Sequence, residues 1–91
     1  MKVQDILTDE SKWTKQFFAR KANGHYASPD NDDAVCWCIL GAIQKAYPDL
    51  TEQNKILTKL YAKFPGKSVT VWNDFNASFP EVRALIEELD I

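Results

Sequence analysis

The chain has 91 residues, enough for one domain with a modest hydrophobic core. Hydrophobic residues make up 45% of it and charged residues 26%, which excludes a disordered chain, and the net charge of −2 disfavours non-specific nucleic-acid binding. No apolar run reaches the ~20 residues of a membrane span, and the acidic start is unlike a signal peptide. We therefore expect a cytoplasmic protein with reduced cysteines.

The first periodic segment predicts a helix from about Asp9 to Ala22. Trp13 and Phe17 are four residues apart, which places both on one helical face. The Asn23-Gly24 pair that follows is typical of a helix end. Residues 23–32 then predict a loop.

The centre of the chain holds its longest apolar run, residues 34–43. This run predicts a helix over residues 33–47, which Pro48 ends. A helix that is apolar all round belongs inside a fold. We therefore expect the other helices to pack around this one.

One side of that central helix carries only the small residues Ala34, Cys38 and Gly41, for which we expect structural roles. A glycine inside a helix costs ~1 kcal/mol relative to alanine, so it usually has a packing reason. Gly41 therefore predicts close approach by another backbone or by the ring of Trp13 or Trp72. Replacement of Gly41 by leucine is expected to destabilise the fold.

Two capping boxes mark the starts of later helices, and they are formed by Asp49 with Glu52 and by Ser78 with Glu81. Between them, Ser68 or Thr70 is expected to cap a short helix over residues 72–76. The first of the later helices has one apolar stripe, formed by Leu50, Leu57, Leu60, Tyr61 and Phe64. Together the elements predict an all-α fold, a compact single-domain orthogonal bundle of about five helices around the central buried helix.

Few residues offer catalytic or metal-binding chemistry. Cys36 and Cys38 would point roughly 200° apart on a helix, so they cannot share a metal, and with His25 they would need an exposed thiolate for hydrolysis. Residues 30–33, Asp-Asn-Asp-Asp, begin like an EF-hand loop, but the glycine and glutamate that such a loop needs further on are missing, so these residues predict helix capping. We therefore predict no catalytic residue, no metal and no cofactor.

Asn73-Asp74 is the polar pair with the strongest claim to a role, because it lies between two aromatic residues. A partly buried pair must find hydrogen-bond partners, either by tying the loop of residues 23–32 or a helix end, or by contacting a ligand. Exposed aromatic residues can take part in an interface. The candidate binding residues are Asn73, Asp74, Trp37 and Tyr26.

Two short patterns stand out in the chain, Ala34-x-x-Trp37-Cys38-x-x-Gly41-Ala42, and Trp72-Asn73-Asp74 followed by a helix with Glu81-Val82. In these patterns the chain resembles a family of small uncharacterised proteins of bacteria and their phages. Cys36 departs from the polar or basic residue that such proteins often have there. The resemblance implies a compact, intracellular, mostly helical domain that is phage-encoded in some cases, and it implies no specific activity.

The predicted function is that of a small intracellular, non-catalytic interaction protein, with a host protein as partner if it is encoded by a phage. Two alternatives remain open at this point. One is an enzyme or metal protein that uses Cys36, Cys38 and His25, or Asn73-Asp74. The other is a nucleic-acid-binding module whose basic face consists of Lys55, Lys59, Lys63 and Lys67.

Overall fold

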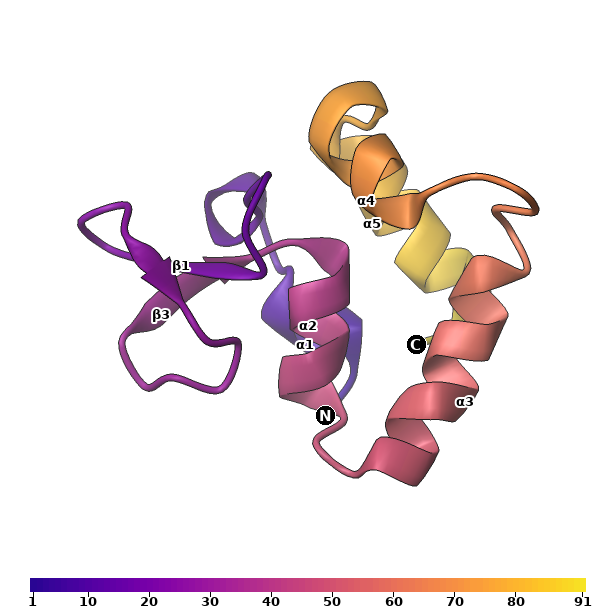
Figure 1. Cartoon of the computed structure of the whole chain (residues 1–91), viewed down its shortest axis with the longest axis horizontal. Helices are drawn as coiled ribbons and strands as arrows, with labels where there is room; N and C mark the ends of the chain where they lie inside the picture. The colour runs from indigo at the N-terminus through magenta and orange to yellow at the C-terminus, as the bar shows by residue number, and fades with distance from the viewer.

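The computed structural model describes residues 1–91 and shows an α+β fold (Figure 1). Its five α-helices are α1 (Val3–Ile6), α2 (Ile39–Ala46), α3 (Leu50–Tyr61), α4 (Val69–Val71) and α5 (Phe79–Leu89). Two further helical turns are the 3-10 turn η1 (Glu10–Lys12) and the π-helix η2 (Trp72–Asn76). The strands are β1 (Ala19–Lys21), β2 (Tyr26–Ala27) and β3 (Ala34–Trp37). The prediction of about five helices is therefore confirmed, but the all-α class is wrong, because the chain also forms a small three-stranded sheet.

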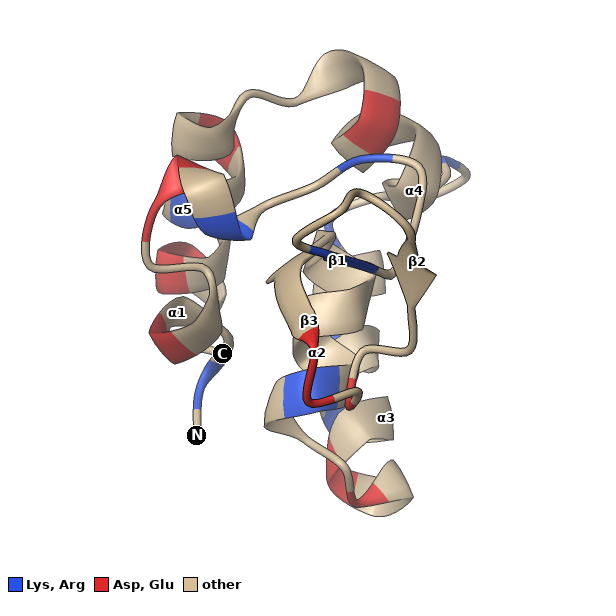
Figure 2. Ribbon diagram, turned by 90° about the vertical axis from the view of Figure 1, so that its left-hand side faces the viewer, with Lys and Arg blue, Asp and Glu red and all other residues tan.

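The three strands form one antiparallel sheet in the order β2-β1-β3, which lies beside α2 (Figure 2). Asn23-Gly24 is the turn of the β1–β2 hairpin, and Gly24 has the positive φ of +85° that such turns need. The helix predicted over residues 9–22 is thus wrong. The Asn-Gly pair is a hairpin signal, whereas the four-residue spacing of two aromatic residues is compatible with other conformations.

The helix predicted over residues 33–47 is correct only in its second half. Residues 34–37 form β3, which pairs with β1, and α2 begins at Ile39. Cys38 is the N-cap: its backbone is extended, and its Sγ accepts a hydrogen bond from the Gly41 N–H at 3.3 Å. An apolar run fits a buried strand as well as a buried helix, and here it contains one of each. Ala34 consequently lies opposite Lys21 in the sheet and not on the helix surface with Gly41.

The second half of the chain follows the predicted order of helices. The Asp49 side chain caps α3, and the Ser78–Glu81 capping box begins α5. Ser68, and not Thr70, caps α4, which continues into η2 over residues 72–76. The predicted stripe of α3 needs correction, because Leu50 and Tyr61 are exposed while Ile56 and Leu60 are buried.

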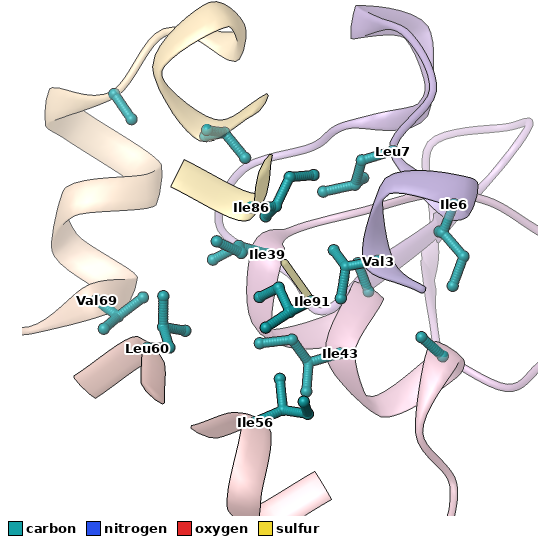
Figure 3. Close-up of a cluster of buried hydrophobic side chains, with 14 residues drawn as sticks. Val3, Ile6, Leu7, Ile39, Ile43, Ile56, Leu60, Val69, Ile86 and Ile91 are labelled. Carbon is teal, nitrogen blue, oxygen red and sulfur yellow. The ribbon is translucent and has the colours of Figure 1, made fainter. Parts of the chain in front are cut away.

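The core lies where α1, α2, α3 and α5 meet (Figure 3). In α2, Ile39 and Ile43 are fully buried and point toward residues of the two chain ends, including Val3 and Ile91. The Val3 N–H donates to the Ile91 carbonyl at 2.8 Å, which fixes α1 beside the end of α5. The prediction that the central helix lies in the core is therefore confirmed for α2, which is shorter than the predicted helix. None of the helices has the length and apolar character that a membrane crossing requires.

Candidate functional site

A pocket of about 240 Å³ opens between the β1–β2 hairpin and the α4–η2 segment. Its apolar lining comes from three exposed aromatic residues and two residues of the α2 start, namely Phe17, Phe18, Tyr26, Cys38 and Leu40. Its polar lining consists of Gln16, Thr70, Asn73 and Asp74. A concave, mainly apolar surface with a few polar groups is the usual form of a binding site.

The aromatic wall of the pocket is unusually accessible. Phe17, Phe18 and Tyr26 are 41%, 42% and 55% exposed, and the ring centroids of Phe17 and Tyr26 lie 6.0 Å apart. The Arg20 guanidinium lies 4.4 Å from the Phe17 centroid and donates hydrogen bonds to the carbonyls of Gly24 and Lys15. Arg20 therefore holds the segment before β1 against the hairpin turn.

Asn73, at the inner side of the pocket, is 1% exposed and uses its full hydrogen-bonding capacity within the chain. Its Oδ1 accepts from Trp13 Nε1 at 2.9 Å and from the Ile39 N–H at 3.2 Å. Its Nδ2 donates to the Thr14 carbonyl at 3.2 Å and to Asp74 Oδ1 at 2.9 Å. Asn73 thus joins η2 to the segment after η1 and to the start of α2, rather than to the loop of residues 23–32.

Asp74 contributes one oxygen to this network and leaves the other free. Its Oδ1 accepts from Asn73 Nδ2 and, at 2.8 Å, from the backbone N–H of Gln16, while its Oδ2 accepts no hydrogen bond within the chain. Gln16 has a left-handed backbone with φ of +73°, a conformation uncommon outside glycine, asparagine and aspartate. The Asp74 carboxylate therefore fixes the turn that carries Phe17 and Phe18 into the pocket wall.

The remaining candidate residues lie in different places. Trp37 is outside the pocket, and its Nε1 donates to the Pro29 carbonyl at 2.8 Å, which holds the loop before β3. His25 is exposed in the β1–β2 hairpin. No three His, Cys, Asp or Glu side chains are arranged to hold a metal ion.

The polar residues Asp30 to Asp33 precede the strand β3, so the prediction that they cap a helix is wrong. Asn31 Oδ1 accepts from the Asp33 N–H at 2.8 Å, a turn that leads into β3. Of the predicted basic face, Lys55 and Lys59 lie on α3, while Lys63 lies just after it and forms an ion pair with Glu88 of α5 at 3.1 Å. Of the four lysines of this face, only Lys63 has an ion-pair partner, and the nucleic-acid alternative stays a prediction.

A family model for proteins of unknown function, DUF6197, matches residues 1–89. The chain belongs to the DUF6197 family. No curated protein and no solved structure matches it. Membership agrees with the predicted resemblance to an uncharacterised family, while a bacterial or phage origin stays a prediction.

Three of the predicted binding residues of this DUF6197 chain line the pocket, namely Tyr26, Asn73 and Asp74. Five other lining residues were not predicted from the sequence, namely Gln16, Phe17, Phe18, Leu40 and Thr70. Phe17 was assigned to the face of a helix that does not form. The available signal was a pair of adjacent phenylalanines shortly before an Asn-Gly hairpin turn, because neighbouring side chains of an extended segment point to opposite sides and seldom bury both rings.

The thiols of the DUF6197 chain allow a direct prediction. Cys38 is 8% exposed, and its burial raises the pKa of the thiol, so little of the reactive thiolate forms. The variant Cys38→Ser keeps only the thiol of Cys36, and Cys36→Ser keeps only that of Cys38. We expect iodoacetamide to label Cys36 much faster than Cys38 in the folded protein, and at similar rates once urea has unfolded it. Mass spectrometry measures both rates. Faster labelling of Cys38 in the folded protein would indicate an activated thiol and favour the enzyme alternative.

Proposed function

We propose that this DUF6197 protein is a small, non-catalytic binding protein that holds a short segment of another protein in the pocket between the β1–β2 hairpin and η2. One observation carries the proposal. Three aromatic side chains, those of Phe17, Phe18 and Tyr26, stand 41–55% exposed around one pocket although the chain has a separate apolar core.

Exposed aromatic rings grouped at a concave site favour association, because each ring offers a large apolar area at a low cost in conformational entropy. Scattered exposed apolar residues need no explanation, but these three line the same pocket. Tyrosine and other aromatic residues are also the side chains that contribute most to binding at interfaces.

The pocket wall is held in place before any partner arrives. Arg20 fastens the segment before β1 to the hairpin turn, and the Asn73–Asp74 network fastens the Gln16 turn to η2. A preformed site loses less conformational entropy on binding than a mobile one. At about 240 Å³ the pocket is too small for a folded element, whose helices alone are ~10–12 Å wide, so a short segment fits it best.

The absence of an activated nucleophile in the pocket supports a non-catalytic role. Cys38 accepts a hydrogen bond from the Gly41 N–H, and its pKa is raised by burial. A cytoplasmic site of action and a host protein as partner belong to the same proposal. They rest on the unpaired cysteines and on the resemblance to phage and bacterial proteins.

The proposal is tested by selecting a random peptide library on the immobilised protein and measuring Kd for the selected peptides. We expect Phe17→Ala and Tyr26→Ala each to weaken binding by about 10- to 100-fold, the usual range for a central aromatic contact. Leu50→Ala is the matched control, because Leu50 is 70% exposed on α3, away from the pocket, and its loss should change Kd less than about twofold.

Each variant is first checked for an unchanged circular dichroism spectrum and melting temperature. Selected peptides that bind the parent and the two aromatic variants equally well would contradict the proposal. A library that yields no binding peptide would contradict it as well.

A further inference from the structure

Resting on the proposed function, we infer that the occupant of the pocket is a basic side chain, lysine or arginine, of the partner segment. The pocket carries one negative charge that the chain does not neutralise. The Asp74 carboxylate lines the pocket, its Oδ2 accepts no hydrogen bond within the chain, and none of the ion pairs of the protein includes it. A carboxylate beside an apolar wall binds a cation more strongly than a neutral group.

The apolar wall suits the rest of such a side chain. Lysine and arginine have an apolar stem and a cationic head, so the stem can lie along Phe17, Phe18 and Tyr26 while the head reaches Asp74. Aromatic ring faces also attract cations directly. The chain itself provides an example, because the guanidinium of Arg20 lies 4.4 Å from the centroid of Phe17. Since Arg20 already engages that ring, we expect the cationic head of the occupant to lie toward Asp74 and away from Arg20.

Two further polar side chains of the pocket lining have oxygen atoms that accept no hydrogen bond within the chain. The amide oxygen of Gln16 and the hydroxyl of Thr70 make no hydrogen bond within the protein, and both residues are exposed at the pocket. An ammonium group has three donors and a guanidinium has five. Together with Asp74 Oδ2, these oxygens offer a cationic head up to three acceptors.

The overall charge agrees with a basic partner. The protein has a net charge of −2, so a basic segment approaches it without long-range repulsion. An acidic segment would be repelled by the unpaired carboxylate of Asp74. A purely apolar side chain would lie against Asp74 Oδ2 without offering it a hydrogen-bond donor. Charge complementarity therefore favours lysine or arginine over both.

The test uses three small probes on the full chain: N-acetyl-lysine amide, N-acetyl-arginine amide and uncharged N-acetyl-norleucine amide, which keeps the apolar stem. Nuclear magnetic resonance titration gives Kd from the amide shifts of Gln16, Phe17 and Phe18. We expect at least one cationic probe to bind about tenfold more tightly than norleucine amide, the effect of one charge-assisted hydrogen bond.

Asp74→Asn removes the charge and retains an oxygen that can accept from Gln16 and Asn73, so the fold should persist. It should reduce the affinity for the cationic probe about tenfold and leave norleucine amide unchanged. Asp32→Asn is the matched control, since it removes one exposed carboxylate outside the pocket, and it should have no effect on either probe.

Equal binding of charged and uncharged probes, or an unchanged affinity in Asp74→Asn, would overturn the inference. If selected peptides still depended on Phe17 and Tyr26 in that case, the proposed function would stand with an apolar occupant. Peptides that bind without the aromatic wall would instead overturn the proposed function.

Discussion

Gly41→Ala is expected to destabilise the protein by about 3 kcal/mol, the upper part of the range for overpacking a core. A Cβ at Gly41 would lie 1.9 Å from the carbonyl oxygen of Phe18 and 2.7 Å from its carbonyl carbon. These are backbone atoms, so no side-chain rotation relieves the contact. The same carbonyl accepts a hydrogen bond from the Cys38 N–H at 3.2 Å, which the displacement would break.

Thermal unfolding measures this effect, and a loss of about 3 kcal/mol should lower the melting temperature by on the order of 15 °C in a chain of this size. Gly24→Ala is the matched control. Gly24 has φ of +85° but no atom within 4 Å of its Cβ position, so only the left-handed backbone is penalised, by about 1–2 kcal/mol. If Gly41→Ala melted at the temperature of the parent, the close contact between α2 and Phe18 would be refuted.

The contact at Gly41 also links the core to the pocket. Phe18 lines the pocket, and its backbone touches the helix that supplies the core with Ile39 and Ile43. Displacing Phe18 should therefore weaken peptide binding together with stability. Peptide binding is compared between the parent and Gly41→Ala at a low temperature at which the variant is still folded.

Asn73→Ala is expected to cost about 4 kcal/mol, because it removes four hydrogen bonds from a side chain that is 1% exposed. Two donors, Trp13 Nε1 and the Ile39 N–H, would lose their shared acceptor, and each unsatisfied buried donor costs about 1–3 kcal/mol. The loss is a large share of the ~5–15 kcal/mol that stabilises a typical domain. Urea unfolding measures it.

Asn76→Ala is the matched control for Asn73, since Asn76 is exposed at the end of the same π-helix and makes no side-chain hydrogen bond. It should change stability by less than about 0.5 kcal/mol. We expect Asn73→Ala to lose stability and peptide binding together, because the network fixes the Gln16 turn. Loss of binding with unchanged stability would instead show that Asn73 contacts the ligand itself.

The capping residues of the second half could be predicted because their determinants are local, although α4 begins at Val69 and not at Trp72. Asp49, Ser68 and Ser78 each hydrogen-bond to backbone or side chains within three residues, and such contacts depend little on the rest of the fold. The close approach at Gly41 also left a local signal, a glycine inside a helix. Its partner, the backbone of Phe18, lies 23 positions away and left no signal.

The sheet could not be predicted because its determinants are long-range. β1 has only three residues, and it is a strand because β3 pairs with it on one side and β2 on the other. The run from Ala34 to Ile43 has one apolar composition throughout but changes from strand to helix at Cys38. Cysteine is not among the residues that usually cap helices, so composition gave no warning of the change.

The candidate site shows the same division. Asn73 and Asp74 drew attention as polar residues among aromatic ones, and both line the pocket. Phe17 and Phe18 did not, because exposure depends on where the chain turns. That turn occurs at Gln16, which adopts a left-handed conformation. Its backbone N–H donates a hydrogen bond to Asp74, a residue 58 positions away.

The most direct test of the proposed pocket is a map of amide chemical shifts of the isotope-labelled protein titrated with a selected peptide. The largest changes are predicted at Gln16, Phe17, Phe18, Tyr26 and Asp74. Changes concentrated instead on Lys55 and Lys59 of α3, or on the loop of residues 30–33, with the pocket amides unmoved, would contradict the assignment of the binding site.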